Sequence, residues 1–306
     1  MKFLIATKKP FAPAAVQGIK ELVEGAGHEI AILEKYEDKA QLLDAVKDAN
    51  AMIIRSDKID KEVFDAAKEL KIVARAGAGY DNVDLAEATA HNVVVMNTPG
   101  QNSNAVAELV MGMLVYMVRN FYNGKPGTEL MGKKLGILAF GNVGRNVARV
   151  AKGFGMDVYA VDAFVPAEKI EEAGVKALKD NEELFKTCDI VSLHIPAVKD
   201  TIKSINYDLV KLMPEGGILV NAARKEVIDE EGLLKLLKER EDLRYIADIA
   251  PDMNDEYKEA LGNRYFATPK KMGAQTAEAN INAGMAAARQ ILGYFKDGCE
   301  KFRVNK

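Results

Sequence analysis

Residues 135–144 read Leu-Gly-Ile-Leu-Ala-Phe-Gly-Asn-Val-Gly and decide how the chain folds. The apolar run Leu135–Phe140 is continuous, as in a strand that is buried on both faces of a parallel sheet. Gly141 and Gly144 follow, and a helical stretch begins near Arg145. A strand, a glycine-containing turn and a helix in this order predict part of a parallel sheet flanked by helices.

The same alternation of short apolar runs and amphipathic stretches continues on both sides of this segment. Before it, we expect strands at Lys2–Thr7, Glu29–Leu33, Ala51–Arg55, Ile72–Arg75 and Val93–Met96, with helices at Ala14–Glu24, Lys39–Lys47 and Lys61–Glu69. After it, we expect strands at Asp157–Val161, Ile190–His194, Gly217–Val220, Tyr245–Asp248 and Tyr265–Ala267. Two longer helices are predicted at about Ser103–Arg119 and Thr276–Lys296.

A length of 306 residues exceeds what one compact core usually serves, so two domains are expected. We predict an α/β fold with two doubly wound parallel sheets. The first is a discontinuous flavodoxin-like domain, residues 1–98 plus 283–306. The second is a Rossmann domain, residues 99–282.

Composition limits the class of function. Lys plus Arg number 42 against 45 Asp plus Glu, and the net charge of −3 gives no general attraction to nucleic acid or to an anionic membrane. Two cysteines, Cys188 and Cys299, are too few for a disulfide framework. No stretch approaches the roughly 20 apolar residues of a membrane span. A cytoplasmic enzyme or binding protein, with no metal site, is expected.

The glycine turn predicts a dinucleotide site. The usual fingerprint is G-x-G-x-x-G, and Ala139 stands in the place of its first glycine. Gly141 would let the backbone approach a pyrophosphate, and Gly144 would let the helix pack closely on the strand. The backbone amides of Asn142 and Val143 would bind the phosphates at the helix N-terminus.

Asp162 ends the following strand, about 20 residues past the glycines, where an acidic residue binds a ribose diol. A carboxylate at this position repels the additional phosphate of NADP, so NAD is the expected cofactor. The alternative is a glycine-rich turn without a ligand. The strand, the helix and Asp162 in register argue against that alternative.

Further motifs resemble those of the D-isomer-specific 2-hydroxyacid dehydrogenase family. They are Arg-Ala-Gly-Ala-Gly-Tyr-Asp-Asn-Val-Asp at 75–84, Asn-Thr-Pro-Gly-Gln-Asn-Ser at 97–103, Ala-Glu-Leu at 107–109 and Asn-Ala-Ala-Arg at 221–224. The resemblance runs from about Ile53 to about Thr276. It is greatest to the D-3-phosphoglycerate dehydrogenases, in a short form without a C-terminal regulatory domain. It implies hydride transfer between NAD and carbon 2 of a small 2-hydroxy acid, an active site in a cleft between two domains, and a homodimer.

The resemblance assigns roles to individual residues. Arg224 matches the arginine that grips the substrate carboxylate and polarises the oxygen of the reacting carbon. Asp248 matches the aspartate that faces the nicotinamide, although a strand-end aspartate is often only a helix cap. The remaining residues assigned to the cofactor are His194, Pro196, Ala222, Gly273 and Ala274.

Two positions depart from the family pattern. Where the family has a glutamate five residues after the aspartate, this chain has Met253 with Asp252 beside it. Where the family has histidine directly after a proline, the segment 269–276 reads Pro-Lys-Lys-Met-Gly-Ala-Gln-Thr. Counting forward from the proline puts Lys270 in the histidine place, and counting back from Gly273 puts Lys271 there.

The two losses have one physical explanation. A catalytic histidine needs a carboxylate to orient its ring and favour the imidazolium, whereas a lysine ammonium is charged without help. We expect Lys270 or Lys271 to be the acid and base, with a pKa lowered from about 10.4 by Arg224 and Arg75. The alternative is that both lysines are solvated and the site is inactive. The histidines, His28, His91 and His194, do not restore a histidine mechanism.

Basic residues also follow strands of the first domain. Arg55, Ser56 and Lys58 come after one strand, and Arg75 with the amides of Ala76 and Gly77 comes after the next. The resemblance places Asn102 and Ser103 near the carboxylate end of the substrate. Such a set suits a multiply charged anion, so 3-phosphoglycerate and 3-phosphohydroxypyruvate, the pair at the first step of serine synthesis, are the expected substrates.

Two other interpretations stay open. The first is another 2-hydroxyacid dehydrogenase, one that reduces glyoxylate or hydroxypyruvate. The second is an NAD-sensing binding protein without catalysis, like the transcriptional corepressors of the family. The loss of histidine and glutamate favours the sensor, whereas Arg224 and the basic loops argue against it.

Overall fold

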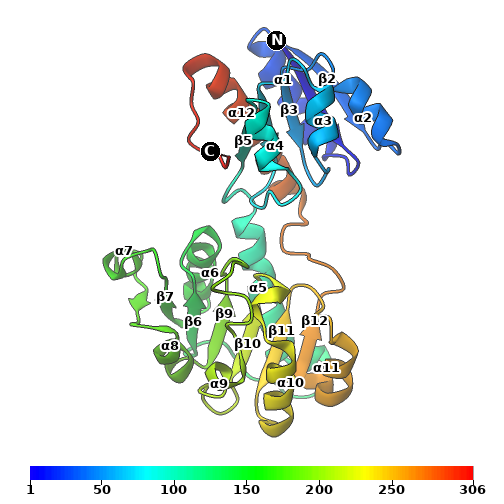
Figure 1. Ribbon diagram of the computed structural model, residues 1–306. Helices are drawn as coiled ribbons and strands as arrows, with labels where there is room; N and C mark the ends of the chain where they lie inside the picture. The colour runs from blue at the N-terminus through cyan, green and yellow to red at the C-terminus, as the bar shows by residue number, and fades with distance from the viewer. Residues whose placement is uncertain (306) are drawn as a thin grey trace. The chain divides into compact units, whose positions relative to one another are not determined.

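The computed structural model describes residues 1–305, which form two compact units (Figure 1). Unit 1 comprises Met1–Asn102 and Thr276–Lys306, and unit 2 comprises Ser103–Gln275. The units divide the chain after residues 102 and 275, whereas the sequence placed the divisions after 98 and 282. Each division falls directly beside the start of a long helix, because each helix packs along its whole length within one unit.

Unit 1 is built on a five-stranded parallel sheet in the order β2-β1-β3-β4-β5. Successive side chains of β1 point to opposite faces: Phe3 and Ile5 pack with α1 and α12, and Leu4 packs on the other side, with α2 to α4. The strands are β1 Lys2–Thr7, β2 Glu29–Glu34, β3 Ala51–Ile54, β4 Ile72–Arg75 and β5 Val94–Asn97. The helices are α1 Pro13–Gly25, α2 Lys39–Ala45, α3 Lys61–Ala66, α4 Leu85–Ala90 and α12 Ala277–Asp297.

The C-terminal tail covers the edge of this sheet. The Oδ1 atom of Asn305 accepts a hydrogen bond from the Val95 amide at 2.8 Å, and its Nδ2 donates to the Val93 carbonyl at 2.9 Å. Asn305 is 2% exposed, so these bonds form away from water. The tail thereby occupies polar groups that an open edge strand leaves unpaired.

Unit 2 contains a seven-stranded parallel sheet in the order β12-β11-β10-β9-β6-β7-β8. Its strands are β6 Lys134–Leu138, β7 Asp157–Val161, β8 Lys176–Ala177, β9 Ile190–Leu193, β10 Ile218–Asn221, β11 Arg244–Ala247 and β12 Tyr265–Ala267. Its helices are α5 Ser103–Val118, α6 Asn142–Gly153, α7 Ala167–Glu172, α8 Asn181–Thr187, α9 Tyr207–Val210, α10 Glu230–Glu239 and α11 Asn254–Leu261, with short 3-10 turns at Asn120–Tyr122, Lys225–Val227 and Gly262–Arg264. Both sheets are doubly wound, as predicted. The two-residue strand β8 is too short to leave a periodic signal in the sequence.

The apolar character of α5 is explained by burial within its own unit. Val110, Leu114 and Met117 are at most 1% exposed and pack with the strands and with α6. Tyr116 adds edge contacts to the rings of Phe121 and Phe266, with centroids 4.9 and 5.4 Å away. The helix therefore needs no partner subunit to cover it, and the expected homodimer stays a prediction.

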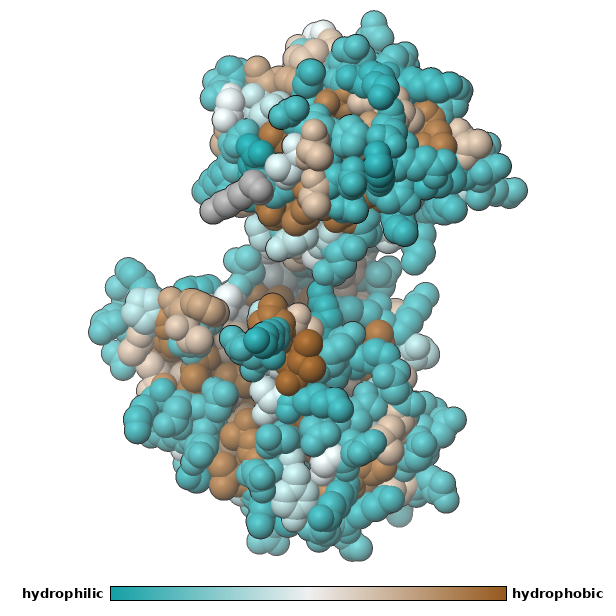
Figure 2. Space-filling view, viewed as in Figure 1, coloured by the Kyte–Doolittle hydropathy of each residue, from teal (hydrophilic) through white to brown (hydrophobic). Residues whose placement is uncertain are grey.

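The visible face of each unit is mostly hydrophilic, with scattered apolar side chains rather than one broad apolar surface (Figure 2). Within residues 1–305, no helix is both long and apolar enough to cross a membrane.

The close approach of α6 to β6 gives a test of the fold. A Cβ atom on Gly144 would lie against the carbonyl oxygen of Ala139 and 3.0 Å from Cγ2 of Ile137, whereas one on Gly141 would meet open space. We expect Gly144→Ala to lower the free energy of unfolding by about 2 kcal/mol, because backbone cannot move aside easily. Urea unfolding followed by circular dichroism would measure the loss. Gly141→Ala is the matched control, and an equal loss in both variants would contradict the packing argument.

Candidate active site

The loops that follow the strands of unit 2 are held side by side at one edge of the sheet. The backbone amide of His194 donates to the Leu138 carbonyl at 2.9 Å, which joins the loops after β9 and β6. The Asp248 amide donates to the Asn221 carbonyl at 2.8 Å, and the Thr268 amide extends the series to the loop after β12. The strand order reverses at β6 and β9, and ligands of open parallel sheets bind at the carboxyl ends beside such a reversal.

The turn between β6 and α6 has the shape of a phosphate-binding loop. Ala139 adopts a φ of +77°, the left-handed conformation that glycine would adopt more readily. Gly141 is exposed and has no atom within 4 Å of the place a Cβ would occupy. The amides of Asn142 and Val143 open a 12-residue helix and lack intrahelical partners there. The turn is therefore open where an anion would approach.

Asp162 ties this turn to the loop after β7. One carboxylate oxygen accepts from the Phe140 amide at 2.6 Å. The other accepts from the amides of Phe164 and Val165 at 2.7 and 2.9 Å. The oxygen that accepts from Phe140 keeps a second lone pair, so the carboxylate can still accept a hydrogen bond from a ribose hydroxyl. Its assignment to the ribose stays a prediction.

His194 provides a second feature that fits a ligand. Its Nε2 atom lies 2.9 Å from the Ser192 hydroxyl, and its Nδ1 atom is buried without a hydrogen-bond partner among the described residues. Burial, together with the nearby charge of Lys271, lowers the pKa of the imidazole to about 3, so the ring is neutral at physiological pH. A buried nitrogen without a partner is costly, and a polar group of a bound NAD would satisfy it.

The remaining residues assigned to the cofactor lie in the same unit. Ala222 is buried directly after β10, Pro196 is exposed in the loop after β9, and Ala274 is half-buried. A Cβ on Gly273 would lie 2.8 Å from the Asp248 carboxylate, so this position requires glycine.

The most distinctive feature of the site is a carbonyl oxygen shared by two cations. Arg224 donates from Nη1 to the Ala223 carbonyl at 3.0 Å, and Lys271 donates from Nζ to the same oxygen. Within residues 1–305, neither cation forms a salt bridge with a carboxylate. Two neighbouring positive charges without an anionic partner are arranged to receive an anion.

The structure distinguishes the two candidate lysines. Lys270 is exposed, whereas Lys271 is half-buried and turned toward Ala223. Burial and then the charge of Arg224 lower the pKa of Lys271 to about 8, with Asp248 and Glu226 acting in the opposite direction. The sequence could anticipate the effect of Arg224 but not the larger effect of burial.

Asp248 holds the loop that carries Lys271. Its carboxylate is 1% exposed and accepts hydrogen bonds from the Thr268 hydroxyl and from the amides of Met272 and Gly273, at 2.9, 2.7 and 2.9 Å. These bonds flank Lys271 on both sides in the sequence. Asp248 therefore fixes the backbone of the lysine loop, and a cap of α11 is not its role.

Neither Asp252 nor Met253 offers Lys271 a carboxylate in the place of the missing glutamate. Asp252 is exposed and pairs with Lys225 at 2.5 Å, and Met253 packs into the apolar core of unit 2. Within residues 1–305, no group of three or more His, Cys, Asp or Glu side chains is placed to hold a metal ion. The lysine accordingly stands without the carboxylate that a histidine would need.

The expected substrate residues of unit 1 lie after β3 and β4. Arg55 is half-buried, donates to the carbonyls of Lys9 and Pro10 at 3.0 and 2.7 Å, and lies over the Phe11 ring. Arg75 donates from Nε to the Arg55 carbonyl at 3.0 Å.

Other expected substrate groups already have partners in the chain. The amide of Ala76 donates to Ile54, and that of Gly77 donates to Arg75. A Cβ on Gly77 would overlap the Arg75 guanidinium, so glycine allows that side chain to lie across the backbone.

Ser103 and Asn102 stand where the chain passes between the two units. Ser103 is buried at the start of α5 and accepts a hydrogen bond from Asn146 at 3.1 Å. Asn102 is half-buried just before α5, and Ser56 and Lys58 are exposed. Because the residues expected to bind substrate are divided between the units, the sequence assignment stays a prediction.

Sequence reasoning missed the residue that shapes the arginine loop. Asn221 is 2% exposed; its Oδ1 accepts from the Ala223 amide at 3.0 Å and its Nδ2 donates to the Arg224 carbonyl at 2.9 Å. A polar residue ending an apolar strand was the available signal. The acceptor role of the Ala223 carbonyl left no signal, because any residue supplies a carbonyl.

Comparison with known proteins agrees with this geometry. The model of the NAD binding domain of D-isomer specific 2-hydroxyacid dehydrogenases matches residues 117–263. The D-3-phosphoglycerate dehydrogenase of Methanocaldococcus jannaschii is 34% identical over 298 residues, which cover 89% of this chain and 57% of that protein. The hydroxypyruvate reductase of Thermotoga maritima is 33% identical over 282 residues, covering 86% of this chain and 90% of that protein.

A solved structure is similar over the whole chain. The NAD⁺-bound 3-phosphoglycerate dehydrogenase of Entamoeba histolytica has a TM-score of 0.88 and 48% identity, with 100% of this chain and 99% of that chain covered. The chain thus spans just over half of the archaeal relative but nearly all of the Entamoeba structure. With its NAD-binding domain in unit 2, this chain belongs to the D-isomer-specific 2-hydroxyacid dehydrogenase family.

Proposed function

We propose that this protein oxidises D-3-phosphoglycerate to 3-phosphohydroxypyruvate with NAD, the first step of serine biosynthesis. One observation supports catalysis. The side chains of Arg224 and Lys271, neither with a carboxylate partner, donate to the same carbonyl oxygen in the NAD-binding unit. The names of similar proteins, the archaeal relative and the Entamoeba structure, favour the phosphorylated substrate. The activity, the substrate and a homodimeric assembly all belong to this proposal.

In this mechanism Arg224 binds the substrate carboxylate and polarises the oxygen on carbon 2. Its guanidinium presents a fork of N–H donors that matches a carboxylate, so it fixes the substrate carboxylate and orients carbon 2. As the hydroxyl becomes a carbonyl, the same positive charge stabilises the developing negative charge on oxygen. When bound, NAD supplies the acceptor for the hydride that leaves carbon 2.

Lys271 moves the proton. In the oxidation direction its neutral amine accepts the proton of the substrate hydroxyl, and in the reduction direction its ammonium returns that proton to the oxygen. A pKa of about 8 places both forms within reach of physiological pH. The Asp248 network holds the lysine loop in place, so the amine needs no separate carboxylate to orient it.

Reduction of hydroxypyruvate is the second candidate, because a relative covered over 90% of its length is a hydroxypyruvate reductase. It uses the same proton and hydride transfers on a substrate without phosphate. A non-catalytic sensor is disfavoured, since a sensor needs neither a carboxylate-binding arginine nor a lysine with a lowered pKa.

The lysine mechanism predicts opposite pH dependences in the two directions. Oxidation requires neutral Lys271, so kcat/KM for 3-phosphoglycerate should rise about tenfold per pH unit below pH 8 and level off above it. Reduction requires the ammonium and should weaken above the same midpoint. Steady-state rates of NADH formation and consumption across pH 6 to 10, roughly two units either side of the pKa, would measure both limbs.

Substitution separates the two lysines. Lys271→Ala should lower kcat by about 100-fold or more, since general acid–base catalysis contributes at least that much. Lys270→Ala is the matched control, because Lys270 is exposed and should leave kcat unchanged. A large loss in Lys270→Ala with normal turnover in Lys271→Ala would reverse the assignment.

Arg55 tests the substrate class. We expect Arg55→Ala to lower kcat/KM for 3-phosphohydroxypyruvate by about 100-fold, the effect of losing charge-assisted hydrogen bonds to a phosphate. Turnover of glyoxylate by the same variant serves as an internal control for folding and should persist. Equal losses with both substrates would instead indicate that Arg55 supports the fold through Lys9 and Pro10.

A further inference from the structure

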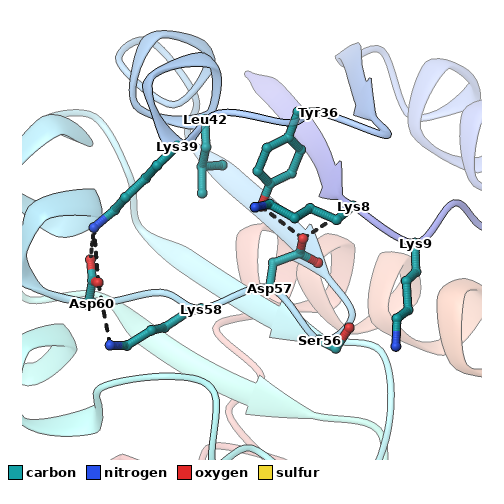
Figure 3. Close-up of a pocket in the computed structure, with 9 residues that line it drawn as sticks. All are labelled: Lys8, Lys9, Tyr36, Lys39, Leu42, Ser56, Asp57, Lys58 and Asp60. Carbon is teal, nitrogen blue, oxygen red and sulfur yellow. Dashed lines mark hydrogen bonds and ion pairs between the residues drawn. The ribbon is translucent and has the colours of Figure 1, made fainter.

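Unit 1 contains a cavity whose lining lies mostly outside the residues expected to bind substrate, with Ser56 and Lys58 belonging to both sets. Its volume is about 510 Å³, within the range of small-molecule sites. Four lysines, Lys8, Lys9, Lys39 and Lys58, line it together with Tyr36 and two aspartates (Figure 3). The lysines come from the loops after β1 and β3 and from the start of α2, so three separate segments place positive charge around one space.

The position of this cavity in the sheet is one where ligands bind. The chain leaves β1 toward β2 on one side, and the later strands continue from β3 on the other side, so the order reverses between β1 and β3. Lys8 and Lys9 follow the carboxyl end of β1, and Lys58 follows that of β3. Open parallel sheets bind ligands in the crevice outside the carboxyl ends at such a reversal.

One of the two aspartates is occupied within the protein. Asp57 is 5% exposed, and its Oδ1 accepts from the Lys8 amide at 2.7 Å and from the Tyr36 hydroxyl at 2.8 Å. Burial and this carboxylate raise the pKa of Tyr36 above its usual value, so the phenol remains a neutral donor. These hydrogen bonds make Asp57 a fixed part of the cavity wall.

The second aspartate, Asp60, pairs with two of the lysines, and a bound anion could take the place of its carboxylate. Asp60 lies 2.9 Å from the amine of Lys39 and 3.9 Å from that of Lys58, and Glu62 also pairs with the Lys39 amine at 2.6 Å. Lys8 and Lys9 have no carboxylate partner within residues 1–305, and the Lys8 amine lies over the Tyr36 ring. The cavity therefore carries more positive than negative charge.

The cavity is separate from the guanidinium of Arg55. That side chain turns toward Phe11 and Asn280, on the α1 and α12 face of the sheet. Lys39 and Leu42 border the cavity from α2, on the opposite face. An anion bound among these lysines would therefore lie away from the Arg55 guanidinium, although Ser56 and Lys58 are shared with the set expected to bind substrate.

We propose that this cavity binds a small molecule carrying two linked phosphoryl groups, a diphosphate. Four lysine amines match the charge and the many acceptor oxygens of that group better than they match a single carboxylate. This site goes beyond the proposed dehydrogenase reaction and does not depend on it.

Binding of inorganic pyrophosphate to the full chain tests the proposal directly. Isothermal titration calorimetry with saturating NAD present, to occupy the dinucleotide site of unit 2, should show pyrophosphate binding. The Lys8→Gln, Lys39→Gln double variant should weaken its affinity by about tenfold or more. Lys47→Gln is the matched control, since this lysine is outside the cavity and pairs with Asp44 at 2.9 Å.

Asp60→Asn gives a test of opposite sign. Removing its charge frees Lys58 and leaves Lys39 with Glu62 as its remaining partner, so pyrophosphate binding should tighten by about threefold, an effect that a purely structural role would not produce. Inorganic phosphate should bind more weakly than pyrophosphate in every variant. Absence of pyrophosphate binding would overturn the proposal, as would binding that Arg55→Ala abolishes and the lysine double variant leaves intact. Neither result would bear on turnover of 3-phosphoglycerate, which is measured separately.

Discussion

Parallel pairing of the strands is the constraint on which the rest of this structure depends. In a parallel sheet all carboxyl ends lie at one edge, so residues far apart in the chain reach the same place. In unit 2 this brings the turn before α6, His194, Arg224 and Asp248 to one edge, where backbone hydrogen bonds join their loops. In unit 1 the same geometry gathers the lysines after β1 and β3.

The buried carboxylate of Asp248 fixes the position of the lysine loop at this edge of the sheet. It holds the loop of Lys271 through two amides and a hydroxyl, and such charge-assisted bonds are strong where water is excluded. The next residue, Ile249, has a φ of +125°, which is strained for a β-branched side chain. Strain of this kind persists only where surrounding contacts hold it, and it is concentrated at functional sites.

The proposed lysine mechanism treats the loss of histidine and the loss of glutamate as one change rather than two. A histidine requires a carboxylate to orient it and to keep it protonated, whereas a lysine is protonated by default and must instead be made less basic. Burial and Arg224 do this for Lys271. In the proposed mechanism Lys271 is the proton donor, so Met253 can pack against the apolar core and Asp252 can pair with Lys225 without loss of that function.

The sequence by itself determined the two parallel sheets, most strand positions and the glycine turn, because period and turn chemistry are local properties of the chain. It also pointed to Arg224, which stands in a motif, and to Asp248 at a strand end, and the roles assigned to both stay predictions. It could not choose between Lys270 and Lys271, because the segment is one residue longer than the family pattern and can be aligned from either end. The structure distinguishes them: Lys271 is half-buried and donates to the Ala223 carbonyl, whereas Lys270 is exposed. Nor could it find the lysine cavity, since Lys8, Lys39 and Lys58 meet only when strands distant in sequence pair in parallel.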